Sequence, residues 1–147
     1  MNTPSLYIGI DPGTQTGIAF YDIELEKLVK VDSQKIHRAM DIVLRFHVET
    51  DIFVRVEDAR QRKWFGNSGR EKLQGAGSVR RDSKIWEDYL TDNGIPFELV
   101  APKNNMTKLS SKSFKQITGY TGRASQNGRD AAMLVYGFQN NNSNDRQ

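Results

Sequence analysis

Cysteine is absent from this chain of 147 residues, and histidine occurs only twice. Without cysteine there is no disulfide and no thiolate metal centre, and we expect an intracellular setting. We interpret both histidines, His37 and His47, as structural residues. Neither a cysteine nucleophile nor a Ser–His pairing is therefore indicated.

Long apolar runs are also missing. No run reaches transmembrane length, and residues 1–5 are neither basic nor followed by a long apolar core, so we expect neither a signal peptide nor membrane association. The apolar fraction of 37% is low but compatible with a globular fold, and 147 residues correspond to one domain by default. We expect this domain at residues 1–138, followed by a polar, disordered tail at residues 139–147.

Acidic residues are missing from residues 102–129, and the charge is unevenly distributed along the whole chain. Residues 1–58 contain 10 acidic and 6 basic residues, net −4, whereas residues 59–147 contain 8 acidic and 15 basic residues, net +7. The second part therefore has the character of a surface for a polyanion. The candidate polyanion contacts are Arg60, Arg62, Lys63, Arg70, Lys72, Arg80, Arg81, Lys108, Lys115 and Arg129.

Two aromatic residues, Trp64 and Phe65, lie next to each other within this basic region, in the glycine-bounded segment 63–69. Aromatic rings on a basic loop are suited to stacking on unpaired nucleic-acid bases. The alternative is that one of the two rings packs into the core and leaves the other free.

Two apolar segments each end in a carboxylate. Residues 6–10 precede Asp11, and residues 52–56 precede Glu57. Both segments have the character of strands, and the helix predicted between them is a crossover, which makes the two strands parallel. If the strands are neighbours, both carboxylates project at one edge of the sheet, where open α/β sheets place their sites.

Adjacent carboxylates repel each other unless a cation bridges them. Oxygen ligands favour Mg²⁺ or Mn²⁺.

Two of these acidic residues also have an interpretation that does not involve a metal. Asp11 precedes Pro12 and Gly13, where an aspartate is also typical of a turn. Asp58, directly after Glu57, is either a ligand, a cap or the partner of a basic neighbour.

The rest of the pattern predicts the other elements. By residue range these are strands 18–21, 28–31 and 96–101, and helices 34–49, 71–93, 110–118 and 127–138. We expect Ser33 to cap the first helix, and Phe114 and Ile117 to face inward from the short third one. Asp130 lies in the first turn of the last helix, where the helix dipole favours a carboxylate without any further role.

Four motifs, in their order along the chain, resemble the RuvC-type Holliday-junction resolvases, especially their phage-borne relatives, within the ribonuclease H-like superfamily. The motifs are IGIDPGTQTGIAFYD, VRVEDAR, KLQGAG and NGRDAAMLV, and the resemblance covers about residues 5–138. It implies an α/β fold whose five-stranded mixed sheet has the order 3-2-1-4-5 with flanking helices. It also implies a homodimer that nicks four-way DNA junctions with Mg²⁺, without a small-molecule cofactor, in the cytoplasm of a bacterial or phage-infected cell.

The resemblance assigns roles to individual acids. Asp11, Glu57 and Asp130 match the three catalytic acids of the family. The mechanism that fits is hydrolysis by two ions, Mg²⁺ or Mn²⁺, about 3.5–4 Å apart, which clamp the scissile phosphate. Asp11 would bridge both ions, Glu57 would hold one of them, and Asp130 together with Asn127 would hold the other.

The basic residues take a second set of roles under this resemblance. Lys112 falls near the family's basic residue at the scissile region, with Lys108 and Lys115 as competitors for that place. The candidate polyanion contacts and the two adjacent aromatic residues become DNA contacts. One departure concerns Arg60, which occupies the place where bacterial members have a junction-stacking phenylalanine.

Asn127 is a second departure, because the resolvases usually place an aspartate or histidine three residues before the last catalytic acid. An amide oxygen can bind a hard cation, but it brings neither a charge nor a base. The alternative interpretation is that Asn127 is the N-cap of the last helix.

Three rival functions remain open at this stage. The first keeps the nuclease fold but acts on flaps, single strands or RNA–DNA hybrids. The second is a catalytically weak module that only binds branched DNA, which Asn127 suggests. The third is an actin-like ATPase, because Asp-x-Gly-Thr at residues 11–14 also suits a phosphate loop, but that fold needs a longer chain with two large domains.

Overall fold

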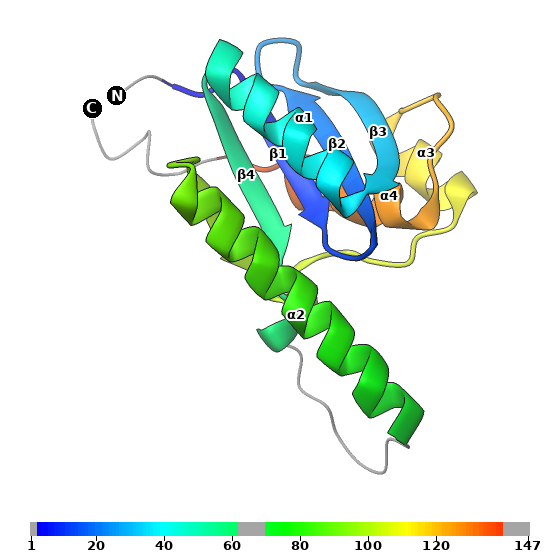
Figure 1. The fold of residues 1–147 in the computed structure, drawn as a ribbon. Helices are drawn as coiled ribbons and strands as arrows, with labels where there is room; N and C mark the ends of the chain where they lie inside the picture. Colours follow the sequence, from blue (N-terminus) through cyan, green and yellow to red (C-terminus); the bar gives the residue numbers. More distant parts are fainter. Residues whose placement is uncertain (1–2, 62–69, 140–147) are drawn as a thin grey trace.

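Five strands form one mixed sheet in the computed structural model, which describes residues 3–61 and 70–139 and, for residues 70–76, the backbone alone. The strands are β1 (Leu6–Asp11), β2 (Gln15–Asp22), β3 (Lys27–Lys35), β4 (Ile52–Glu57) and β5 (Phe97–Val100). Their order in the sheet is β3-β2-β1-β4-β5 (Figure 1). The pairs β1–β2 and β2–β3 are antiparallel, whereas β1–β4 and β4–β5 are parallel. The predicted fold class and strand order are confirmed.

Helices cover both faces of this sheet (Figure 1). They are α1 (Ile36–Glu49), the short 3-10 helix η1 (Ala59–Gln61), α2 (Arg70–Asp92), a second 3-10 helix η2 (Pro102–Asn104), α3 (Ser111–Thr118) and α4 (Gln126–Val135). α1 and α2 form a core with one face through residues such as Val43 and Trp86, and α3 and α4 form a core with the other through Phe114 and Leu134. None of the described helices has both the length and the apolar character that a membrane crossing requires.

The third strand is longer than predicted, and the predicted cap is wrong. β3 continues through Ser33 and Gln34, because these residues pair with Gly17 and Thr16 of β2. Helix α1 therefore starts only at Ile36, and its N-cap position makes no side-chain capping bond. Pairing with a neighbouring strand, which local sequence does not reveal, outweighs the capping preference of serine here.

The shorter helices bring two further corrections. Phe114 is buried as predicted, but Ile117 is 40% exposed. The N-cap of α4 is Ser125, whose side chain accepts a backbone N–H in the first turn, so Asn127 is a residue of the helix and not its cap. α4 also ends earlier than predicted, ahead of Gly137, whose φ of +72° is left-handed. The remaining predicted elements agree with the observed bounds to within one to three residues.

Two glycines allow α4 to lie directly against the sheet. A Cβ atom at Gly9 of β1 would stand 2.0 Å from the carbonyl oxygen of Ala131, and one at Gly17 of β2 would stand 2.0 Å from that of Asn127. Both neighbours are backbone atoms of α4, so only glycine fits at these strand positions. The first turns of α4 are thereby held over the second half of β1 and the start of β2.

Candidate functional site

The parallel strands β1 and β4 end side by side, as predicted (Figure 1). Their last paired residues are Ile10 and Val56, and Asp11 and Glu57 follow directly. Glu57 is buried, with 6% of its surface exposed, and Asp11 is partly buried. Both acids therefore lie at one edge of the sheet, at the carboxyl ends of parallel strands.

Asp130 reaches the same region from α4. It precedes Ala131, the residue whose carbonyl lies against Gly9 of β1. One carboxylate oxygen of Asp130 accepts a hydrogen bond from the backbone N–H of Lys108 at 2.8 Å and another from the side chain of Gln126 at 3.1 Å. Lys108 has a left-handed φ of 59°, which is uncommon for a residue with a side chain.

Asn105 connects Glu57 of β4 with Asp130 of α4. Its Nδ2 atom donates to Oε2 of Glu57 at 3.1 Å and to the backbone carbonyl of Asp130 at 3.1 Å. The sequence did not single out Asn105. The signal that would have indicated it is its position after β5, because β5 is parallel to β4 and its end belongs to the same sheet edge.

The other polar atom of Asn105 has no such partner. Among the described residues, Oδ1 is buried and makes no hydrogen bond. A buried acceptor left without a donor typically costs about 1–3 kcal/mol. Exchanging the oxygen and nitrogen of the amide would not help, because the oxygen would then face the carboxylate of Glu57 and the carbonyl of Asp130.

The side chains of Asp11, Glu57 and Asp130 are not close enough together to bind one metal ion in their present positions. Among the described side chains, those of residues 3–61 and 77–139, no three acidic or histidine residues are close enough together to form a metal-binding group. The chemistry of the site nevertheless fits a hard cation, because carboxylate and amide oxygens are the ligands that Mg²⁺ and Mn²⁺ prefer. The unpartnered Oδ1 of Asn105 beside Glu57 agrees with such a fit.

Asn127 lies in the first turn of α4 and uses its side chain on the neighbouring hairpin. Its Nδ2 atom donates to the backbone carbonyl of Gln15 at 3.2 Å. Asn127 and Asp130 are three residues apart in one helix and therefore lie on the same face. Its metal-binding role stays a prediction.

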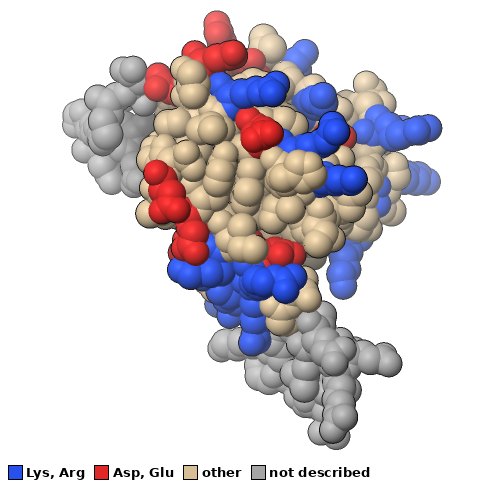
Figure 2. All heavy atoms as spheres, in the orientation of Figure 1, with Lys and Arg blue, Asp and Glu red and all other residues tan. Residues whose placement is uncertain are grey.

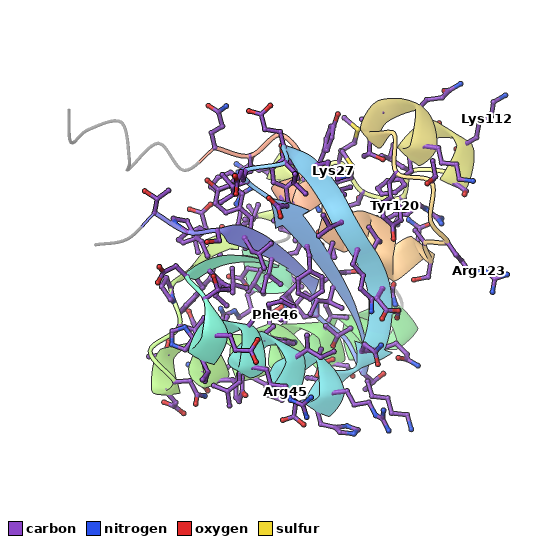
Figure 3. The ribbon with its side chains drawn as sticks, turned by 90° about the horizontal axis from the view of Figure 1, so that it is seen from above. Lys27, Arg45, Phe46, Lys112, Tyr120 and Arg123 are labelled. Carbon is purple, nitrogen blue, oxygen red and sulfur yellow. The ribbon has the colours of Figure 1, made fainter. Side chains whose placement is uncertain are left out.

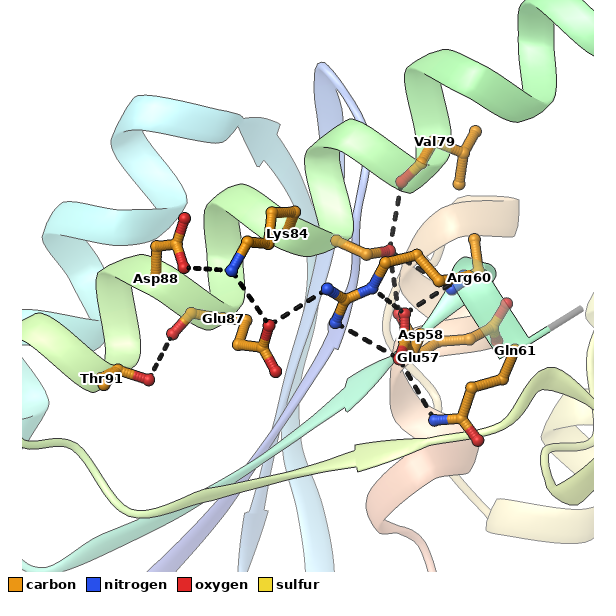
Figure 4. Close-up of polar contacts among 11 residues, drawn as sticks. Glu57, Asp58, Arg60, Gln61, Val79, Lys84, Glu87, Asp88 and Thr91 are labelled. Atoms are coloured by element: carbon orange, nitrogen blue, oxygen red, sulfur yellow. Dashed lines mark hydrogen bonds and ion pairs between the residues drawn. The ribbon is translucent and has the colours of Figure 1, made fainter.

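Asp58 pairs with a basic neighbour, which was one of the alternatives for this residue (Figure 4). Its carboxylate accepts from Arg60 Nε at 2.8 Å and from Gln61 Nε2 at 3.2 Å. Burial by itself raises the pKa of Asp58, but the hydrogen bonds from Arg60 and Gln61 outweigh it and hold this pKa below its usual range. These bonds hold η1 against the end of β4 next to Glu57, and a ligand role for Asp58 stays a prediction.

Arg60 is engaged inside the protein as well. It bonds Glu87 of α2 at 3.1 Å in addition to Asp58, and these two partners raise its pKa well above the ordinary value for arginine (Figure 4). Its charge is thus largely offset by two acids. Contact of Arg60 with DNA stays a prediction, and its bonds to Asp58 and Glu87 favour a role in joining η1 to α2.

The other predicted basic contacts fall into distinct groups. Arg80 and Arg81 are exposed on α2, and Figure 2 shows Lys and Arg side chains gathered beside the part of α2 that extends beyond the sheet. Arg129 instead donates to the backbone carbonyls of Leu109 and Ala124, so it ties the preceding loop to α4. The predicted contacts Arg62, Lys63, Trp64 and Phe65, and the side chains of Arg70 and Lys72, lie outside the described part of the chain.

Lys112 does not approach the acids in the described geometry. It is exposed on α3, and its side chain points away from the sheet in Figure 3. Of its two competitors, Lys115 is also exposed on α3, whereas Lys108 contacts Asp130 through its backbone N–H. Of these three lysines, Lys108 is the one with a contact to a candidate acid, and its backbone makes that contact.

Comparison with known proteins places this architecture. No family model and no curated protein matches the chain. Among solved structures it is similar to T. thermophilus RuvC in complex with a Holliday junction substrate, with a TM-score of 0.54, 16% sequence identity, and coverage of 89% of this chain and 90% of that chain. Similarity at this identity shows a shared fold and leaves the chemistry to be argued from the site. The chain thus has the ribonuclease H-like α/β fold in the arrangement of RuvC.

Proposed function

We propose that this chain is a divalent-metal-dependent endonuclease that nicks four-way DNA junctions by phosphodiester hydrolysis. The observation that supports this most is the meeting of three elements at one sheet edge, namely the ends of β1 and β4 and the first turns of α4. Each of these elements bears one of the acids Asp11, Glu57 and Asp130. The RuvC structure of the same fold contains a Holliday junction, which suggests that substrate class for this chain.

The residues proposed to hold metal are Asp11, Glu57, Asp130 and Asn127. A carboxylate has about four acceptor sites, so Asp130 can keep its bonds from Lys108 and Gln126 and still bind an ion. With Mg²⁺ or Mn²⁺ bound there, the ions would supply an activated water and stabilisation of the leaving oxygen. The chain's own contribution is placement, since Gly9 and Gly17 set the distance between α4 and the strand ends.

DNA would be held by the basic residues around this edge. Arg80 and Arg81 on α2 and Lys108 and Lys115 on the opposite side of the sheet are exposed and can contact phosphates. Contacts of this kind recognise the shape of a junction more than its sequence. A homodimer would place two equivalent sites on the two symmetric strands of the junction.

The direct test is incubation of an end-labelled four-way junction with the protein, with and without Mg²⁺, beside a linear duplex, a flap and a single strand of matched sequence. Paired, symmetric nicks that depend on Mg²⁺ and occur only in the junction are the expected result. Equal cutting of the flap or single strand would instead assign the fold to a general nuclease. Sedimentation of the active protein measures whether two copies act together.

A catalytically weak junction-binding module is the second candidate, and Asn127 is the residue that favours it. Its Nδ2 atom is bonded to the carbonyl of Gln15, which leaves the amide oxygen as its only ligand atom for an ion. An amide oxygen brings neither a charge nor a base, so an ion held there by Asp130 and Asn127 would be bound weakly. A junction whose electrophoretic mobility shifts without any cleavage in Mg²⁺ or Mn²⁺ would support this second function.

A further inference from the structure

Asn105 occupies a fixed place at the candidate site. It follows η2, and its backbone N–H bonds to the carbonyl of Pro102 at 3.1 Å. η2 follows β5, whose last residue, Val100, pairs with Glu57 and accepts a hydrogen bond from the N–H of Asp58 at 2.8 Å. The segment from β5 to Asn105 is therefore held at the end of β4 by the backbone hydrogen bonds between β4 and β5.

The side-chain amide of Asn105 is used asymmetrically. Both donor positions of Nδ2 are used, one on Oε2 of Glu57 and one on the backbone carbonyl of Asp130. These bonds fix a carboxylate oxygen of Glu57 and join β4 to α4. Oδ1, by contrast, is buried and has no donor among the described residues. A residue that served only to join the two elements would not need a buried, unused acceptor.

We propose that Asn105 is a positioning residue of the metal site, which orients Glu57 through Nδ2 and offers Oδ1 as a neutral oxygen to a divalent ion or to a water bound to it. This inference rests on the proposed metal-dependent function. Amide oxygens are regular partners of hard cations. Residues that orient metal ligands typically contribute 10–100-fold to metal affinity or activity.

The test is Mn²⁺ binding without DNA, followed by the electron paramagnetic resonance signal of the free ion. The variants are Asn105→Ala and Asn105→Asp, with Asn104→Ala as the matched control, because Asn104 is an exposed neighbour in η2. Asn105→Ala removes Oδ1 and should weaken Mn²⁺ binding about 10-fold or more. Asn105→Asp also removes the Nδ2 bonds but places a second carboxylate beside Glu57, so it should bind Mn²⁺ more tightly than the wild type. The control should match the wild type.

The two variants distinguish a metal-site role from a purely structural one, since both lose the same two hydrogen bonds. Mn²⁺ affinities that change in the same direction in both variants, or do not change in Asn105→Ala, would overturn the inference and leave the metal site standing. A wild-type chain that binds no Mn²⁺ would overturn the proposed metal site as well. Thermal unfolding in EDTA establishes that each variant is folded, and Asn105→Asp, which keeps the shape of the side chain, decides the matter if Asn105→Ala does not fold.

Discussion

At the scale of single residues, the first test of the proposed active site is substitution of its three acids, Asp11, Glu57 and Asp130. Asp11→Asn, Glu57→Gln and Asp130→Asn keep the size of each side chain and remove one negative charge. Each should reduce junction cleavage by more than the roughly 10–100-fold that loss of an outer partner of a metal site costs. Junction binding should stay equal or become tighter, because less negative charge then faces the phosphates.

Cleavage and binding are measured separately, by product formation in Mg²⁺ and by mobility shift in EDTA. Glu49→Gln, an exposed acid at the far end of α1, is the matched control and should leave both unchanged. A variant of one of the three acids that cleaves at the wild-type rate would remove that residue from the site.

Asn127 allows a second test at this scale. An aspartate there would offer a charged ligand to the ion beside Asp130, so Asn127→Asp should lower the Mg²⁺ concentration for half-maximal cleavage, and Asn127→Ala should raise it. The bond from Asn127 to Gln15 means that both variants lose a donor and about 0.5–1.5 kcal/mol of stability. The N-cap is untouched in both, since it is Ser125.

A Mg²⁺ titration of cleavage, with urea unfolding in parallel, separates these two effects for Asn127. One shared midpoint and one shared maximal rate for the wild type and both variants would place Asn127 outside the metal site.

At the scale of elements, the seating of α4 depends on backbone contact with the strands. Gly17→Ala places a methyl group 2.0 Å from the carbonyl oxygen of Asn127, so α4 must move away from β2. We expect a loss of about 1–3 kcal/mol in the free energy of unfolding, the usual cost of overpacking. Cleavage should fall as well, because α4 positions Asp130.

Gly77→Ala is the matched control for this substitution. Gly77 is exposed on α2, and a Cβ atom there would meet nothing within 4 Å. Alanine in a helix is favoured over glycine by about 1 kcal/mol, so this variant should be neutral or more stable. Urea unfolding of both variants is the measurement, and equal stability would contradict the close contact of α4 with the sheet.

At the scale of the whole molecule, the arrangement of charge predicts binding that depends strongly on salt. Each phosphate contact contributes about −0.9 to the slope of log affinity against log salt concentration. Arg80→Gln should therefore reduce the magnitude of this slope for a junction by about one contact. Arg129→Gln should instead destabilise the fold, because Arg129 bonds two backbone carbonyls.

Fluorescence anisotropy at several salt concentrations measures these slopes. Arg45→Gln, on the exposed side of α1, is the control (Figure 3). An unchanged slope for Arg80→Gln would show that the basic end of α2 does not contact the phosphates.

The sequence by itself determined the sheet and the place of its two strand-end acids. A crossover helix makes its strands parallel, so Asp11 and Glu57 were expected at one edge if their strands are neighbours, and the parallel pairing of β1 with β4 confirms it. The strand order came from the resemblance to resolvases and is confirmed as well. Periodicity also located α2 closely, because its long amphipathic pattern ends at a glycine, Gly94, with a left-handed φ of 65°.

Only the tertiary structure decided which polar side chains are engaged inside the protein. Arg60 and Arg129 have the same charge as Arg80 in the sequence, but the fold brings acids and carbonyl groups to the first two. Asn105 is separated from Glu57 by 48 residues, and no local pattern reveals a contact over such a distance. Local sequence encodes strands, helices and turns, whereas the partners of a polar side chain depend on packing between elements that are distant in the chain.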